Sequence, residues 1–67
     1  MSMDIAWEIK KRRMESGLTL YELEERSDHL HHTNISRIEN GSHRPMFYTA
    51  ERILDVLGYE LKIVPKK

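Results

Sequence analysis

The segment Ile35-Ser36-Arg37-Ile38-Glu39-Asn40-Gly41 constrains the fold of this chain more than any other part of the sequence. Its two isoleucines are three residues apart, so they share one face if the segment is helical. The serine, the arginine and the asparagine then lie on other faces, where they can meet a partner. The glycine can adopt the positive φ that ends a helix. The segment therefore predicts a short helix with an apolar inner side and a polar outer side.

A second helix signal lies upstream, in Gly17-Leu18-Thr19-Leu20. Thr19 is a favourable N-cap, and Glu22 follows it at the spacing of a capping box. A helix is therefore expected from Leu20 to Ser27, with Leu20 and Leu23 facing inward. Three glutamates make this helix acidic, so it is not suited to pack its outer side against a negatively charged partner.

The connection between these two helices is expected over residues 28–31. It lacks glycine, but its aspartate and histidines tolerate a left-handed conformation better than most residues do. Leu30 is expected to pack between the helices, and either His31 or Thr33 is expected to cap the next helix, over 32–40. Two short helices joined by a tight turn, with an arginine facing outward, are typical of proteins that bind DNA.

Two further helices are expected, over 4–16 and 46–57, each followed by a glycine that can end it. Ser2 or Asp4 is the candidate cap of the first, and Pro45 stands where the second can begin. Trp7 is expected in the core or at a dimer contact. The expected inner positions are Ile5, Ile9 and Met14 in the first helix and Phe47, Ala50, Ile53, Leu54 and Leu57 in the second.

The C-terminal segment 59–64 alternates apolar and polar residues, which predicts a strand with one buried face within residues 58–65. A single strand needs a partner for its backbone groups, and no other segment predicts a strand. The simplest partner is the same segment of a second copy, which would form a two-stranded antiparallel ribbon across a twofold axis. The expected dimer-interface residues are Tyr59, Leu61 and Ile63.

The length of 67 residues fits one domain, residues 1–67, with a small core. No cysteine is present, which excludes disulfides and thiolate zinc sites. The apolar runs are too short to span a membrane, and the first residues do not resemble a secretion signal, so we expect a cytoplasmic protein. The net charge of zero argues against nonspecific nucleic-acid binding, although residues 29–67 carry more basic than acidic residues.

These motifs resemble the lambda-repressor/Cro-type helix-turn-helix domains, the Xre family, over roughly Ile5 to Gly58. The resemblance implies a mostly α domain of four or five helices, and the added tail is similar to the short strand of some antitoxin-type members, where it builds the dimer. It also implies operator binding as a dimer. The positions that match base-facing residues are His32, Thr33, Ser36 and Arg37, and those that match phosphate contacts are Asn40 and Arg44.

The sequence departs from the family pattern in three places. The interval from Thr19 to Gly41 is one residue longer than usual, and the extra residue falls at Asp28-His29. Glu24 stands where the family usually has alanine, so its carboxylate needs solvent or a basic partner. Leu20 replaces a glutamine that often contacts DNA.

Several of these residues also have simpler interpretations. Arg37 can read guanine through two parallel hydrogen bonds, contact phosphate, or pair with Glu39 or Glu51 at the surface. Asn40 can cap its helix as well as contact phosphate. Arg44 can contact phosphate or remain a loop arginine. The basic run at residues 10–13 is expected to be a solvated helix end, with phosphate contact by Arg13 as the alternative.

Four histidines, at positions 29, 31, 32 and 43, suggest a metal site, because imidazole binds zinc, nickel and copper. No cysteine or well-spaced carboxylate completes a ligand set, so we expect a polar surface facing DNA and no metal. No glycine-rich phosphate loop or catalytic triad is present, so we expect no enzyme activity and no cofactor.

The sequence therefore predicts a sequence-specific transcriptional regulator, a repressor or autoregulator, which binds an inverted-repeat operator on double-stranded DNA as a homodimer. The alternative is a protein-interaction module such as an antitoxin, whose tail strand would add to the sheet of a toxin partner.

Overall fold

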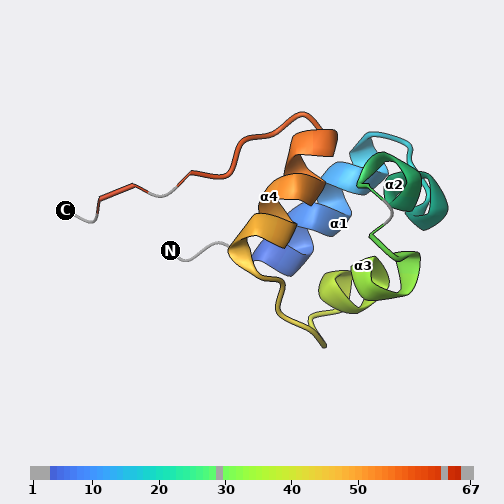
Figure 1. Ribbon diagram of the computed structural model, residues 1–67, viewed down its shortest axis with the longest axis horizontal. Helices are drawn as coiled ribbons and strands as arrows, with labels where there is room; N and C mark the ends of the chain where they lie inside the picture. Colours follow the sequence, from blue (N-terminus) through green and yellow to red (C-terminus); the bar gives the residue numbers. More distant parts are fainter. Residues whose placement is uncertain (1–3, 29, 63, 66–67) are drawn as a thin grey trace.

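The computed structural model describes residues 4–28, 30–62 and 64–65 of the chain. Over these residues it is mostly helical, which confirms the expected fold class (Figure 1). The helices of this described part are α1 (Ile5–Glu15), α2 (Leu20–Arg26), α3 (His32–Glu39) and α4 (Phe47–Val56). Each begins and ends within one residue of the expected position. None of them is long and apolar enough to cross a membrane.

Polar side chains fix where three of these helices begin. The Asp4 carboxylate accepts hydrogen bonds from the backbone amides of Ala6 and Trp7 in the first turn of α1, at 3.1 and 3.3 Å. Thr19 and Glu22 form the predicted capping box of α2: the Glu22 amide donates to the Thr19 hydroxyl, and the Thr19 amide donates to the Glu22 carboxylate. His31 caps α3, because its Nδ1 accepts from the amide of Thr33 at 3.1 Å.

Each helix is followed by a residue with positive φ, which turns the chain sharply. After α3 this residue is Gly41, at φ 78°, and the amide of Ser42 donates back to the carbonyl of Arg37 at 3.1 Å. After α2 it is Asp28, at φ 59°, the only non-glycine residue with positive φ in the described part of the chain. Of the aspartate and histidines expected to tolerate a left-handed conformation in this turn, Asp28 adopts it.

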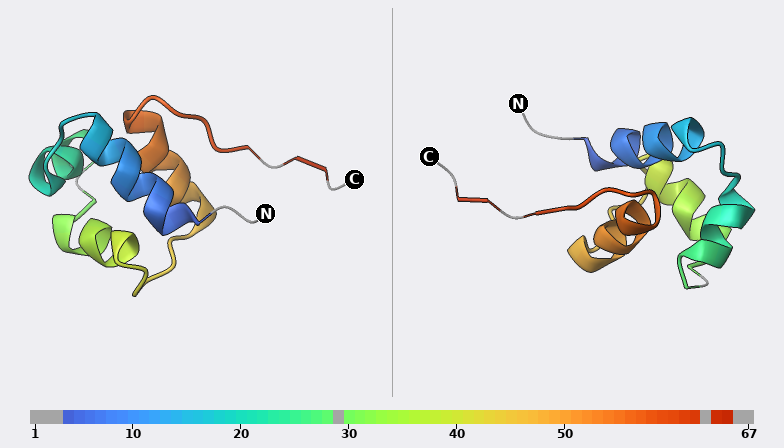
Figure 2. Two further views of the ribbon diagram at one scale, coloured as in Figure 1. Left: turned by 180° about the vertical axis from the view of Figure 1, so that it is seen from behind. Right: turned by 90° about the horizontal axis from the view of Figure 1, so that it is seen from above.

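The core lies where the four helices meet. In Figures 1 and 2, α1 and α4 lie side by side, while α2 and α3 cover one end of this pair. Burying each of the large aliphatic side chains contributes about 1.5–3 kcal/mol. Leu30 packs against this core from the turn, as expected. The buried cluster consists of Ile9, Leu23, Ile35, Ile38, Ile53, Leu54 and Leu57.

Two of the expected core positions, Met14 and Phe47, are wrong, and Trp7 lies outside the core, which leaves the dimer contact considered for it untested. Trp7 is 53% exposed, Met14 is 63% exposed and Phe47 is 45% exposed. Trp7 and Met14 are seven residues apart, and at 3.6 residues per turn both fall nearly opposite the buried Ile9. The outer face of α1 therefore carries them, and the ammonium of Lys11 lies 4.7 Å from the centre of the Trp7 ring.

The C-terminal tail is extended, but no strand occurs in the part of the chain that the structure describes. A strand is defined by ladder hydrogen bonds, and this part of the chain contains no second extended segment to supply them. The strand assignment is thus corrected for the single chain. The tail runs back past α1 and α4 (Figure 2), and Leu61 packs against the core cluster. Ile63 lies outside the described residues.

Candidate nucleic-acid interface

The outer side of α3 is the polar surface that the sequence predicts. Ile35 and Ile38 are 0% and 2% exposed, so they fix which side of this helix faces the core. Helical spacing places four of the predicted DNA-contacting residues on the opposite side of α3. They are the base-facing Thr33, Ser36 and Arg37 and the phosphate-contacting Asn40. Thr33 and Ser36 are half-buried, and Arg37 and Asn40 are exposed.

His32 lies on the flank of α3 that faces α2, where Glu24 holds it. One carboxylate oxygen of Glu24 lies 2.8 Å from the His32 backbone amide and 2.8 Å from the ring Nδ1. The imidazole also packs against two other rings, with centroid separations of 4.3 Å to Tyr21 and 4.5 Å to His31. The basic partner that Glu24 requires is therefore His32.

The two arginines expected at DNA, Arg37 and Arg44, are both exposed. Neither forms an ion pair with a side chain in the described residues. Glu39 is one of the surface partners considered for Arg37. The residue is 9% exposed, and its carboxylate accepts from Arg13 instead. Both guanidinium groups are thus available to an anionic partner.

A helix-turn-helix family model matches residues 9–64, which is most of the chain. The chain belongs to the lambda-repressor/Cro-type helix-turn-helix family. No match was found among curated proteins or solved structures. The family consists of DNA-binding regulators, in which the second helix of the motif enters the major groove. In this chain α2 and α3 are the first and second helices of the motif.

Arg13 has a structural role in this helix-turn-helix domain. Its Nε and Nη2 donate to the two carboxylate oxygens of Glu39 at 2.7 and 2.9 Å, and its Nη1 donates to the carbonyl of Leu18 at 2.9 Å. The side chains of Arg13 and Glu39 are only 14% and 4% exposed. The hydrogen bonds from Arg13 to Glu39 raise the pKa of Arg13 despite its burial. Both sequence-based interpretations of Arg13, solvated end and phosphate contact, are therefore wrong.

The acidic residues of α2 are largely engaged in hydrogen bonds within the motif. Bonds from Thr19 lower the pKa of Glu22, and bonds from His32 lower the pKa of Glu24, with a smaller contribution from the nearby imidazole charges. Both carboxylates therefore favour the ionised state. Glu25 is exposed on the same helix.

The histidines do form a cluster with a carboxylate. The ligating atoms of Glu24, His31 and His32 lie within 4.8 Å of one another. Their hydrogen bonds already account for this proximity, because Glu24 accepts from His32 and His31 accepts from the amide of Thr33. A cation here would also face the positive end of the α3 dipole. His43 is exposed in the loop after α3, and His29 lies outside the described residues.

Sequence reasoning missed Tyr21 at this surface and the buried pairing of Arg13 with Glu39. Tyr21 is 66% exposed next to the start of α3. A large exposed aromatic residue beside a capping box was a signal that could have drawn attention to it. The Arg13–Glu39 pair joins residues 26 apart in sequence, and no local pattern predicts such a contact.

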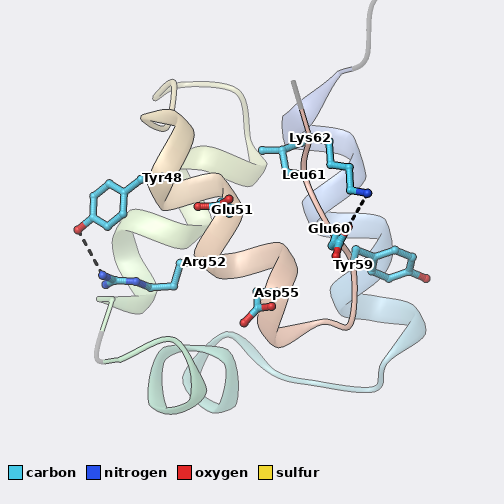
Figure 3. Close-up of a pocket in the computed structure, with 8 residues that line it drawn as sticks. All are labelled: Tyr48, Glu51, Arg52, Asp55, Tyr59, Glu60, Leu61 and Lys62. Carbon is cyan, nitrogen blue, oxygen red and sulfur yellow. Dashed lines mark hydrogen bonds and ion pairs between the residues drawn. The ribbon is translucent and has the colours of Figure 1, made fainter. Parts of the chain in front are cut away.

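A separate groove lies between α4 and the tail (Figure 3). Its polar groups largely pair with one another: Arg52 donates to the Tyr48 hydroxyl at 3.3 Å, and Lys62 lies 3.1 Å from Glu60. On the neighbouring surface the guanidinium of Arg12 lies 4.6 Å from the centre of the Tyr59 ring. The tail residues Tyr59 and Leu61 thus contact α1 and the core of their own chain.

Proposed function

We propose that the protein is a homodimeric, sequence-specific transcriptional regulator that binds an inverted-repeat operator and represses by occluding a promoter. The observation that carries the proposal is the arrangement of α3. Two buried isoleucines fix its inner side, while small polar side chains and Arg37, which has no ion-pair partner among the described residues, occupy its outer side. A helix of this kind fits the major groove of B-DNA.

In the proposed complex, the outer side of α3 faces the base edges. Arg37 donates two hydrogen bonds to guanine O6 and N7, a contact that discriminates against a wrong base by about 1–3 kcal/mol. Thr33 and Ser36 face neighbouring base edges. Asn40 and Arg44 follow at the end of the helix and contact phosphates, which sets the register of the domain on the duplex.

The second copy is proposed to pair through the tail. Among the described residues, the backbone groups of residues 60–62 have no hydrogen-bond partner, so an open edge is present. A 67-residue domain also has a small core, and pairing is a common means of stabilising such domains. The two copies of α3 would then read major-groove segments about 34 Å apart.

Selection of binding sequences from random duplexes tests this proposal. The selected sequences should contain an inverted repeat, and footprinting should show that both halves are protected. Arg37→Ala should relax the preference at one base pair of each half, whereas Arg44→Ala should weaken binding to all sequences alike. Lys10→Ala removes the same charge from an exposed position on α1 and serves as the control.

The salt dependence of binding separates a DNA-binding function from a protein-interaction module. Each phosphate contact should add about 0.9 to the slope of log affinity against log salt, because counterions are released. Selection that yields no common sequence, with no salt-dependent DNA binding, would overturn the proposal.

A further inference from the structure

The Glu24–His32 contact constrains the chemistry of His32, the first of the positions that match base-facing residues of the family. An ionised carboxylate only accepts hydrogen bonds, and the bonds from His32 keep the pKa of Glu24 low. The ring nitrogen that faces Glu24 at 2.8 Å, Nδ1, must therefore carry a proton. In the neutral imidazole the other nitrogen, Nε2, is then a hydrogen-bond acceptor.

The orientation of the ring is also restricted before any DNA is present. Tyr21 from α2 and His31 from the turn pack against it, with ring-centroid separations of 4.3 and 4.5 Å. The Glu24 carboxylate binds both the His32 ring and its backbone amide. No described residue forms a hydrogen bond with Nε2, and the side chain is 30% exposed. A side chain held in this way loses little further conformational entropy on binding.

We infer that Glu24 is a positioning residue that holds His32 as a hydrogen-bond acceptor, so that the domain prefers adenine or cytosine over guanine or thymine at the contacted strand position. In the major groove the adenine N6 and cytosine N4 amino groups are donors, whereas guanine and thymine present acceptors there. An acceptor at Nε2 can thus accept a hydrogen bond from adenine or cytosine, the amino bases. It is repelled by the acceptor oxygen of guanine or thymine, the keto bases. The inference rests on the proposed function, because it requires α3 to lie in the major groove.

The first test measures the tautomer in the protein without DNA, at about pH 8, where imidazole side chains are ordinarily neutral. Long-range proton–nitrogen NMR spectra should show the His32 proton on Nδ1 in the wild type. Glu24→Ala should shift it toward a mixture of tautomers, whereas Glu24→Gln retains an oxygen acceptor and should keep at least part of the wild-type state. A wild-type proton on Nε2 would overturn the inference.

The second test measures base preference on the selected operator, with an amino or a keto base placed at the His32 position of one half. The wild type should favour the amino base by about tenfold, and Glu24→Ala should reduce this ratio to about twofold or less. Glu24→Gln should retain an intermediate ratio. Glu25→Ala removes the same charge from an exposed site on the same helix and should leave the ratio unchanged.

A double-variant cycle separates positioning from general destabilisation. If Glu24 acts through His32, then His32→Ala should abolish the preference, and adding Glu24→Ala should change the ratio no further. Melting curves verify that each variant is folded at the assay temperature. If the wild type binds DNA and Glu24→Ala leaves the amino-to-keto ratio unchanged, this inference alone is overturned. A wild type that binds no DNA would overturn the proposed function together with it.

Discussion

At the scale of single residues, two glutamates determine how α3 is held. Glu24 binds the start of α3 through His32, and Glu39 binds α1 near the end of α3 through Arg13. Both are charged residues at contacts between helices. Their net contribution to folding stability depends there on the quality of their hydrogen bonds. Both carboxylates are paired within the domain. Neither therefore presents an unpaired negative charge that would repel the phosphates of DNA.

Arg13→Ala should destabilise the fold by about 3 kcal/mol, because it leaves the Glu39 carboxylate buried without its partner. The double variant Arg13→Ala/Glu39→Ala should cost less than the sum of the two single variants. Chemical denaturation with a circular dichroism readout measures these differences. Lys10→Ala, at an exposed site on the same helix, should change stability by less than about 0.5 kcal/mol. An equally small effect of Arg13→Ala would contradict the structural role assigned to this pair.

Acid should destabilise the domain through Glu22 and Glu24. Their pKa values are lower in the folded chain than the ordinary value of 4.5, so the folded state binds fewer protons than the unfolded state. Their contribution is fully present above this ordinary value and is lost as pH falls through the lowered pKa values. The melting temperature of the wild type should therefore fall below about pH 4.5, and Glu22→Gln/Glu24→Gln should show a shallower fall. Parallel acid profiles would contradict this assignment.

At the scale of elements, local sequence patterns predicted the helices well because the signals that start and end them are local. Thr19 with Glu22, and Gly41 after α3, fix helix ends through bonds that span only a few residues. The exposure of Phe47 and the Arg13–Glu39 pair depend on how the helices pack, which no local pattern specifies, whereas helical spacing alone places Met14 nearly opposite Ile9. The outer side of α3 could be predicted because Ile35 and Ile38 determine its inner side.

Thr19→Ala should destabilise the domain by about 1 kcal/mol, because the hydroxyl that accepts from the Glu22 amide is lost. Thr19→Ser retains the hydroxyl and should cost only a few tenths of that amount. Thermal unfolding of the two variants measures the difference. Equal melting temperatures for them would show that the capping box contributes little.

At the scale of the whole molecule, the tail has two functions in the proposed dimer: Leu61 packs on its own core, while its backbone pairs with a second copy. Proline lacks the amide proton that such pairing needs. Leu61→Pro and Lys62→Pro remove amides from opposite edges of the extended tail, so one of them should shift the protein from dimer to monomer in sedimentation experiments. Leu61→Ala and Lys62→Ala control for the lost side chains. A wild type that sediments as a monomer would contradict the ribbon.

Methylation interference on the selected operator tests most directly whether α3 reads the major groove in two copies. Dimethyl sulfate marks guanine N7 in the major groove and adenine N3 in the minor groove. Guanine N7 methylation at two sites about one helical turn apart should block binding of the wild type. Binding of Arg37→Ala should no longer be sensitive to methylation of the guanine that Arg37 contacts in the wild type. Interference only at adenine N3, or at a single site, would contradict the proposed placement of α3.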